Sequence, residues 1–235
     1  MSKDRILIVE DDENLAFIMK RIIESNDYNV WVAVSVAEAL SVMKEQSFDL
    51  ILLDMMLPDG QGTEVCKEIR KDSFCPILFV SCLGDSDTKV KALEMGGDDY
   101  IQKPVDYNEL MARIQTNIRR ARQYNLGRSA SAEEFYPGMV IKRNKHEVWL
   151  TDDEKRPVTK VDLSPIEYQL LVCLSEKPGE LFLYHEIYQK VWGDDDLGDV
   201  RTVMVHVSNL RKKMGECGKE LIRTVRAAGY IFGSE

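Results

Sequence analysis

Polar and charged side chains stand at the points where several short apolar runs of the chain end. Glu10 and Asp11 follow the first run, Asp54 ends a later one, and Ser81 and Lys103 follow two more. Runs of this kind are typical of buried parallel strands. The carboxyl ends of parallel strands meet along one edge of a sheet, where ligands bind. We therefore expect these five side chains to form one site.

Their types indicate phosphoryl chemistry that depends on a metal. Three carboxylates in one place repel each other, and a hard divalent cation relieves that repulsion. Mg²⁺ binds a few carboxylates and waters and leaves room for a phosphate oxygen. Lys103 would supply a fixed positive charge and Ser81 a short hydrogen-bond donor. Asp54 is then the natural nucleophile for an acyl phosphate.

The elements that must position this site alternate in type through the first half of the chain. The strand-like runs are residues 5–9, 30–34, 50–53, 77–80 and 100–101. The segments with helical spacing that follow them are residues 14–25, 37–45, 62–71, 86–95 and 108–122. This order predicts an α/β doubly wound domain, with a five-stranded parallel sheet and helices on both faces.

Residues 5–122 resemble the receiver domain of bacterial response regulators, which has a flavodoxin-like fold. The matching stretches are ILIVEDD, ILLDMMLPDGQG, PILFVSC and GGDDYIQKP. The resemblance implies that Asp54 is the phosphoacceptor. It also implies that Glu10, Asp11 and Asp54 hold Mg²⁺ together with the backbone carbonyl of Met56.

The same resemblance implies a switch and a dimer surface. Ser81 and Lys103 would contact the phosphoryl group, and Tyr100 would turn inward when Ser81 is recruited. On the face of the fourth helix, fifth strand and fifth helix, the pairs expected between two copies are Lys89 with Glu109, Asp99 with Arg113, and Asp98 with Arg120. Single surface ion pairs contribute only about 0–1 kcal/mol, so a merely solvated face is the alternative.

The alternation stops after Arg122. We assign residues 1–122 to the receiver, the Ser/Ala/Glu-rich residues 123–137 to a linker, and residues 138–235 to a second domain. That domain begins with short alternating segments and contains three helical stretches. The predicted elements are strands at 139–143 and 147–150, helices at 164–176, 184–191 and 200–214, and a hairpin of 221–225 with 230–232. This order predicts a small α+β fold.

The helix predicted for residues 200–214 has an apolar back and a basic front. Its core stripe is Val203, Val207, Leu210 and Met214. Its front is Arg201, Val205, Ser208 and Lys212, with Thr202 and Asn209 beside them. A helix of this kind suits the major groove of DNA, where basic side chains bind phosphate and short side chains touch base edges. An ordinary amphipathic surface helix is the alternative.

Residues 138–233 resemble the winged-helix effector domain of OmpR/PhoB-type regulators. The matching stretches are LSPIEYQLL, VWGDDDLGDVRTVMVHVSNLRKKM and IRTVRAAGYIF. The resemblance implies phosphate contacts from Arg201, His206, Arg211 and Thr224, base-edge contacts from Val205, Ser208 and Asn209, and a wing contact from Arg226. His206 lies near the core margin, so a buried histidine is the alternative. The acidic loop 194–196 would repel phosphate, and we expect it to face RNA polymerase or solvent.

Charge and composition agree with localised DNA binding. The chain has 40 acidic and 31 basic residues and a net charge of −9. Residues 201–226 nevertheless contain seven basic and two acidic residues, a basic stripe on an acidic protein. We find no apolar run long enough for a membrane span and no signal peptide, and the five cysteines lack a close pair. These features predict a cytoplasmic protein with free thiols and no membrane contact.

The sequence thus predicts a transcriptional regulator of a two-component system and not an enzyme. A sensor histidine kinase would phosphorylate Asp54, the receiver would form a homodimer, and the winged helices would bind double-stranded promoter DNA. One alternative is a regulator independent of phosphorylation, whose receiver serves only for dimerisation. An Asp-based phosphohydrolase is disfavoured, because such enzymes place an Asp-x-Asp pair at the first strand, whereas Asp54 is followed by Met55 and Met56.

Overall fold

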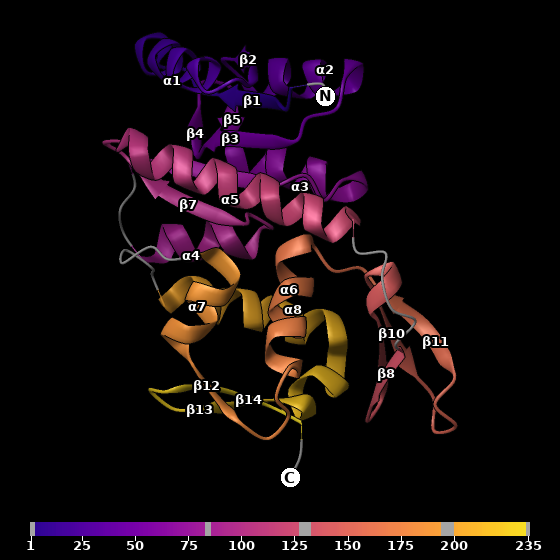
Figure 1. Cartoon of the computed structure of the whole chain (residues 1–235). Helices are drawn as coiled ribbons and strands as arrows, with labels where there is room; N and C mark the ends of the chain where they lie inside the picture. The colour runs from indigo at the N-terminus through magenta and orange to yellow at the C-terminus, as the bar shows by residue number, and fades with distance from the viewer. Residues whose placement is uncertain (1–2, 83–85, 127–132, 194–199, 234–235) are drawn as a thin grey trace. The chain divides into compact units, whose positions relative to one another are not determined.

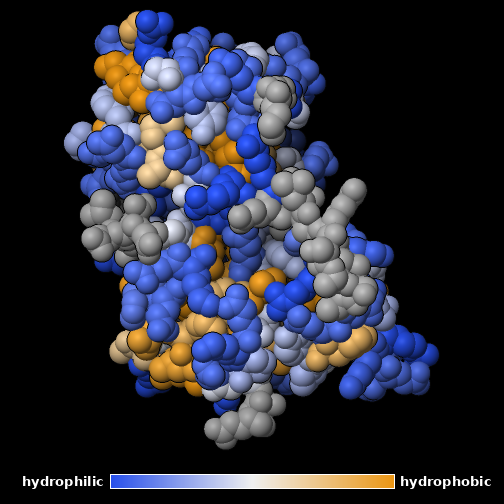
Figure 2. Space-filling model, in the orientation of Figure 1, coloured by the Kyte–Doolittle hydropathy of each residue, from blue (hydrophilic) through white to orange (hydrophobic). Residues whose placement is uncertain are grey.

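A computed structural model describes residues 3–82, 86–126, 133–193 and 200–233 of the chain (Figure 1). The chain divides into two compact units, residues 1–119 and 120–235. The first unit contains the predicted phosphoryl site, and the second contains the predicted DNA-binding helix. Figure 2 shows that the visible face is largely hydrophilic and that apolar side chains reach it only in small groups.

The first unit is built on the predicted five-stranded parallel sheet. Its strands are β1 (Arg5–Val9), β2 (Asn29–Ala33), β3 (Leu50–Asp54), β6 (Ile77–Ser81) and β7 (Asp99–Gln102). The strand order is β2-β1-β3-β6-β7, and every neighbouring pair is parallel. The doubly wound fold is therefore confirmed, and each strand lies within two residues of its predicted position.

Helices cover both faces of this sheet. They are α1 (Glu13–Ser25), α2 (Val36–Glu45), α3 (Gly62–Asp72), α4 (Ser86–Glu94) and α5 (Tyr107–Leu126). Side chains alternate along each strand, so Ile6 and Ile8 pack with α1 and α5. Leu7 and Val9 pack on the opposite face with α2, α3 and α4. This burial on both faces explains why the strands read as continuous apolar runs.

In its described residues, the second unit combines two antiparallel sheets with the helices α6, α7 and α8. Its first sheet has the order β11-β10-β9-β8. The strands of that sheet are β8 (Glu133–Tyr136), β9 (Met139–Lys142), β10 (Glu147–Thr151) and β11 (Pro157–Val161), with the short 3₁₀ helix η1 (Arg143–Lys145) between β9 and β10. Then follow α6 (Pro165–Ser175), β12 (Leu181–Leu183), α7 (Tyr184–Trp192), α8 (Val200–Leu221), β13 (Ile222–Val225) and β14 (Gly229–Phe232). The second sheet has the order β12-β14-β13, and the predicted small α+β winged-helix architecture is confirmed.

Two boundaries differ from the sequence analysis. Helix α5 continues to Leu126 and strand β8 begins at Glu133, so both ends of the predicted linker 123–137 lie in regular elements. Helix α8 runs beyond Met214, but Gly215 has φ 63° and ψ −139°, which interrupts the helix. The predicted end at residue 214 therefore coincides with a kink at a residue that tolerates positive φ.

The start of α6 shows why these residues form a helix there. The Ser164 hydroxyl accepts a hydrogen bond from the backbone N–H of Glu167, and the Glu167 carboxylate accepts one from the backbone N–H of Ser164. Pro165 occupies the first turn, where no N–H is required. These two reciprocal hydrogen bonds form a capping box, which fixes the start of the helix.

All five cysteines are free thiols, as the sequence analysis predicted. Burial raises the pKa of Cys66 to about 11 and that of Cys75 to about 12, which keeps both protonated at neutral pH. Within the described parts of the chain, no helix has the length and apolar composition that crossing a membrane requires.

Candidate functional site

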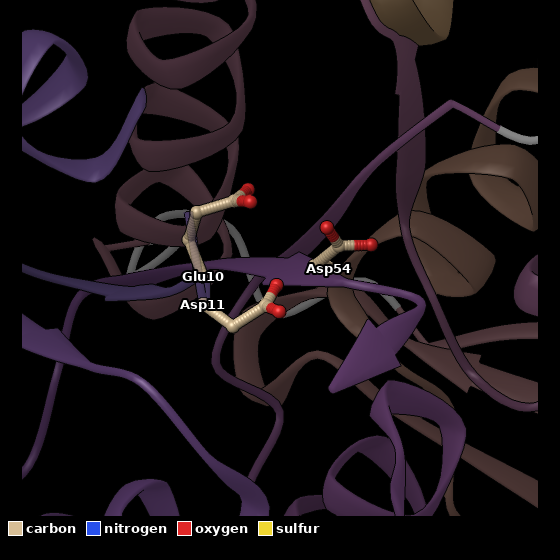
Figure 3. Close-up of side chains that lie close together, drawn as sticks. All are labelled: Glu10, Asp11 and Asp54. Atoms are coloured by element: carbon tan, nitrogen blue, oxygen red, sulfur yellow. The ribbon is translucent and has the colours of Figure 1, made fainter. Parts of the chain in front are cut away.

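The strand ends bring three carboxylates together at one edge of the first sheet. Glu10 and Asp11 follow β1, and Asp54 is the last residue of β3. One carboxylate oxygen of each lies within 4.8 Å of the others, and Figure 3 shows the three groups directed toward a common space. The gathering expected from the sequence is confirmed. Glu10 and Asp54 are buried, whereas Asp11 is exposed.

Lys103 completes this acidic edge from the end of β7. Its ammonium nitrogen lies 2.5 Å from Asp54 Oδ2 and 2.7 Å from Glu10 Oε1. Burial alone would lower the pKa of Lys103, but the hydrogen bonds and charges of Asp54 and Glu10 outweigh it and raise that pKa. The lysine therefore stays charged and offsets part of the negative charge of the site.

Glu10 provides the observation that tests whether a cation fits. Burial raises its pKa to about 7 against the opposing effect of Lys103. Among the described residues, its Oε2 atom is a buried side-chain oxygen without a hydrogen-bond partner. An oxygen in this state beside two more carboxylates suits a hard divalent cation such as Mg²⁺. Glu10, Asp11 and Asp54 are thus the residues that would hold it.

Backbone packing fixes the position of Asp54. Gly62 begins α3 so close to β3 that a Cβ atom on it would lie 1.9 Å from the Asp54 carbonyl oxygen. The backbone N–H of Met56 donates to Asp54 Oδ1 over 3.1 Å. Met56 belongs to a small hairpin of β4 (Met56–Leu57) and β5 (Gly60–Gln61), which the sequence analysis did not predict. A role for the Met56 carbonyl in metal binding stays a prediction.

The remaining residues of the predicted switch are buried near this edge. Ser81 is the last residue of β6, and its carbonyl oxygen accepts a hydrogen bond from the Lys103 backbone N–H over 2.8 Å. The Tyr100 ring is 5% exposed and packs with the core of the α2, α3 and α4 face. The Lys89 ammonium lies 5.7 Å from the centre of that ring. A movement of Tyr100 stays a prediction.

Four of the charged residues expected to pair between two copies, Asp98, Asp99, Glu109 and Arg113, form ion pairs within one chain. Arg113 lies 2.9 Å from Asp99 and 2.8 Å from Glu109. Asp98, Asp99 and Arg113 are buried, so the alternative of a merely solvated face does not hold for these three residues. The physical reason is proximity, because β7 and α5 lie in the same unit and pairing there costs no association entropy. Exchange of these pairs in a dimer stays a prediction.

Arg70 of α3 is a partner that the sequence analysis missed. Its guanidinium lies 2.6 Å from Asp98 Oδ2 and donates to the carbonyl oxygens of Gly96 and Cys75 over 2.8 and 2.7 Å. The backbone N–H of Ile77 also donates to Asp98. Arg70 therefore connects α3 with the turn before β7. Nothing in the sequence pattern links two residues separated by 28 positions.

In the second unit, the core stripe of α8 agrees with the sequence analysis. Val203, Val207 and Leu210 are fully buried, and Met214 is 1% exposed. Of the predicted front, Arg201 and Lys212 are exposed and Ser208 is partly buried, as is Asn209 beside them, whereas Val205 and Thr202 are buried. The exposed part of the front is therefore basic.

Thr202 and His206 do not lie on the solvent side. The predicted place of Thr202 beside the front is therefore wrong, and His206 is the buried histidine given as the alternative to a phosphate contact. They are 1% and 2% exposed, and the His206 ring lies 5.4 Å from that of Trp192 in α7. The reason is that α8 packs against both α6 and α7, so its buried arc is wider than one stripe. Val205 is also buried but is not part of the core cluster of this unit. Its base contact stays a prediction.

The hairpin of β13 and β14 is joined to α8 by one side chain. Arg211 Nε donates to the Ile222 carbonyl oxygen over 3.0 Å, and Nη2 donates to Thr224 Oγ1 over 3.0 Å. The same guanidinium lies 5.3 Å from the centre of the Tyr230 ring. Arg226 is exposed at the turn of the hairpin, beside Ala227 with its φ of 59°. The acidic loop 194–196 lies outside the described residues.

Comparison with known proteins identifies both parts. Residues 6–115 match the response regulator receiver domain, and residues 158–232 match the C-terminal domain of transcriptional regulatory proteins. The chain is 32% identical over 233 residues to "Regulatory protein VanRc" of Enterococcus gallinarum, with 97% of this chain and 98% of that protein covered. The chain belongs to the OmpR/PhoB family of two-component response regulators.

Other members of this family show the same relationship along their whole length. The chain is 36% identical to "Response regulator ArlR" of Staphylococcus saprophyticus, covering 97% of this chain and 98% of ArlR. It is 34% identical to "DNA-binding response regulator MtrA" of Mycolicibacterium smegmatis, covering 98% and 97%. Relatives of this response regulator are therefore DNA-binding transcriptional regulators and not enzymes. A solved RitR mutant shares the fold, with TM-score 0.73, 24% identity and coverage of 99% and 100%.

Proposed function

We propose that this response regulator is phosphorylated on Asp54 by a sensor histidine kinase in the cytoplasm, and then dimerises and binds promoter DNA. The observation that supports the first step best is the meeting of Lys103 with Asp54 and Glu10 at one strand edge. Lys103 places a positive charge beside Asp54, where a phosphoryl group on that residue would carry negative charge. An isolated surface aspartate would need no such partner.

Phosphoryl transfer at this edge would proceed in one balanced step. A carboxylate oxygen of Asp54 attacks the phosphorus of a phosphohistidine, the P–O bond forms as the P–N bond breaks, and the histidine nitrogen keeps the electron pair. The Lys103 ammonium places positive charge beside the incoming phosphoryl oxygens. A bound Mg²⁺ would supply further charge neutralisation there. Burial of Asp54 limits the access of bulk water.

The output would be a shift between two states of the receiver. A phosphoryl group on Asp54 adds negative charge between Lys103 and Ser81, and the state that binds it better becomes more populated. We propose that this state pairs through the face of α4, β7 and α5. Two winged helices would then bind adjacent half-sites, and joining them in one dimer raises their effective concentration at DNA.

The experiment that tests this function compares the full chain with Asp54→Asn. Each protein is incubated with Mg²⁺ and acetyl phosphate, and intact mass, sedimentation and promoter binding are measured. We expect a single phosphoryl addition, dimer formation and tighter DNA binding for the parent only. Equal dimerisation and DNA binding by Asp54→Asn would instead support the regulator that is independent of phosphorylation. Steady turnover of the phosphodonor by the parent would indicate an enzyme.

A further inference from the structure

A large apolar side chain lies on the exposed side of α8 and was not assigned a role above. Met204, the fifth residue of the helix, is 40% exposed. It stands one turn after Arg201 and one turn before Ser208, so all three lie on neighbouring positions of one helix surface. The neighbouring Val203 is fully buried in the core. Core packing therefore does not account for an apolar residue at position 204.

The charges around Met204 suit a nucleic acid. Arg201 and Lys212 are exposed on the same helix, and Arg211 lies between α8 and the hairpin. These basic groups attract phosphate, which positions a protein on a duplex but carries no sequence information. The neutral thioether of Met204 contributes nothing to phosphate binding. Its favourable contacts are with apolar groups.

The major groove offers one such group. The C5-methyl of thymine is the apolar feature at the floor of the groove, and apolar side chains distinguish thymine by contacting it. The first turns of a recognition helix are the part that reaches base edges. Methionine is unbranched and has three rotatable bonds, so the Met204 side chain has the reach and adaptability for this contact.

We propose that Met204 is a specificity-determining residue that contacts the methyl group of a thymine in the major groove. This inference rests on the proposed DNA-binding function. It adds a residue to the base-reading set of Val205, Ser208 and Asn209, because the front predicted for this helix does not include Met204. In the structure, the exposure of the Met204 side chain is the feature that points to this role.

The test removes the thymine methyl group and the Met204 side chain separately. The full chain is treated with Mg²⁺ and acetyl phosphate and used to select duplexes from a randomised DNA library. Each dT of the selected duplex is then replaced in turn by dU, which lacks the methyl group. At one thymine we expect the parent to lose about fourfold in affinity, the equivalent of about 0.8 kcal/mol for one buried carbon group. Met204→Ala should bind the unsubstituted duplex more weakly and should no longer respond to dU at that thymine. Met204→Leu should keep the response.

Two controls separate base reading from other effects. Val158→Ala removes another exposed apolar side chain of the same unit, 62% exposed on β11, and should change neither affinity nor the dU response. Met204→Ala should leave the salt dependence of binding unchanged, whereas Arg201→Ala should reduce its slope by about one unit per lost phosphate contact. A change of slope with Met204→Ala would overturn the proposal.

The remaining outcomes are also decisive. If the parent and Met204→Ala lose the same affinity at every dU, or select the same sequences with equal affinity, Met204 does not read thymine. If the parent selects no duplex at all, the proposed DNA binding itself fails, and the inference fails with it. If the dU response is lost in Met204→Ala and kept in Met204→Leu, the assignment holds.

Discussion

At the scale of single residues, Lys103 sets the charge balance of the acidic edge. Its ammonium is shared between Asp54 and Glu10, while Asp11 stands exposed beside them. Three carboxyl groups beside one lysine offer oxygen ligands to a divalent cation. The same lysine is also the group that would meet a phosphoryl oxygen. Removing its charge should therefore affect the two ligands in opposite directions.

We predict that Lys103→Met binds Mg²⁺ at least about threefold more tightly than the parent but is not labelled by acetyl phosphate, because one positive charge is lost among three carboxylates. In EDTA the variant should unfold at a lower temperature, since two buried carboxylates lose their partner. Added Mg²⁺ should restore its stability. Calorimetric titration and thermal unfolding measure both effects.

Lys89→Met provides the matched control, because the Lys89 ammonium lies 5.7 Å from the centre of the Tyr100 ring. It should leave Mg²⁺ affinity unchanged. Weaker Mg²⁺ binding by Lys103→Met would show that Lys103 does not offset the charge of these carboxylates.

At the scale of elements, the site depends on how closely α3 approaches the end of β3. Gly62 permits this approach because any side chain there would collide with the Asp54 carbonyl oxygen. The opposite end of α3 is held by Arg70, which joins it to Asp98 and to the Gly96 carbonyl. The helix that follows the phosphoacceptor is thus fixed at both ends by specific contacts.

Gly62→Ala should push α3 away from β3. We expect a loss of about 1–3 kcal/mol in the free energy of unfolding, as for other overpacked sites. Because Asp54 would move with its carbonyl, Mg²⁺ affinity and labelling by acetyl phosphate should fall as well. Urea unfolding and intact mass measure these effects. Thr63→Ala at the next position should leave both nearly unchanged, and full labelling of Gly62→Ala would contradict the expectation.

Arg70→Ala should destabilise the first unit by about 3–5 kcal/mol, because it leaves the buried Asp98 carboxylate without its cation. Urea unfolding followed by the fluorescence of Trp31 measures the change. The neighbouring Lys71 forms only an exposed pair with Glu68, so Lys71→Ala should cost no more than about 1 kcal/mol. Similar losses for the two variants would show that the Arg70 pair is not structurally important.

The periodicity of the sequence was sufficient to predict the elements but not their side-chain partners. Strands buried on both faces read as apolar runs, so the convergence of Glu10, Asp54 and Lys103 followed from the rule for parallel sheets. Strands β11 and β12 were missed, since short, partly exposed strands have weak patterns. The partners of Asp98 and the burial of Thr202 depend on tertiary packing, which single-sequence patterns do not encode.

At the scale of the whole molecule, the distribution of charge decides which part of the protein a polyanion can bind. The chain has a net charge of −9, yet residues 201–226 contain seven basic residues and two acidic ones. A duplex is therefore repelled by most of the protein and attracted by one stripe. Orientation on DNA should accordingly be set by this stripe, and association should weaken steeply as salt is added.

Arg201→Ala should reduce the slope of log affinity against log salt by about one unit and weaken binding to all duplexes alike. The slope is measured by fluorescence anisotropy on the selected duplex at several salt concentrations. Arg156→Ala is the control, because Arg156 is exposed in the same unit but pairs with Asp152 in a turn between β10 and β11. A slope unaffected by Arg201→Ala would place the phosphate contacts elsewhere.

The bridge that Arg211 makes between α8 and the β13–β14 hairpin has a consequence for the shape of the target. Because this bridge holds helix and hairpin together, the protein fixes the distance between them. The duplex must therefore have a groove of matching width for the helix to enter it while the hairpin touches the neighbouring strand. A duplex with A-form geometry, whose major groove is deep and narrow, should then be rejected even when its bases are correct.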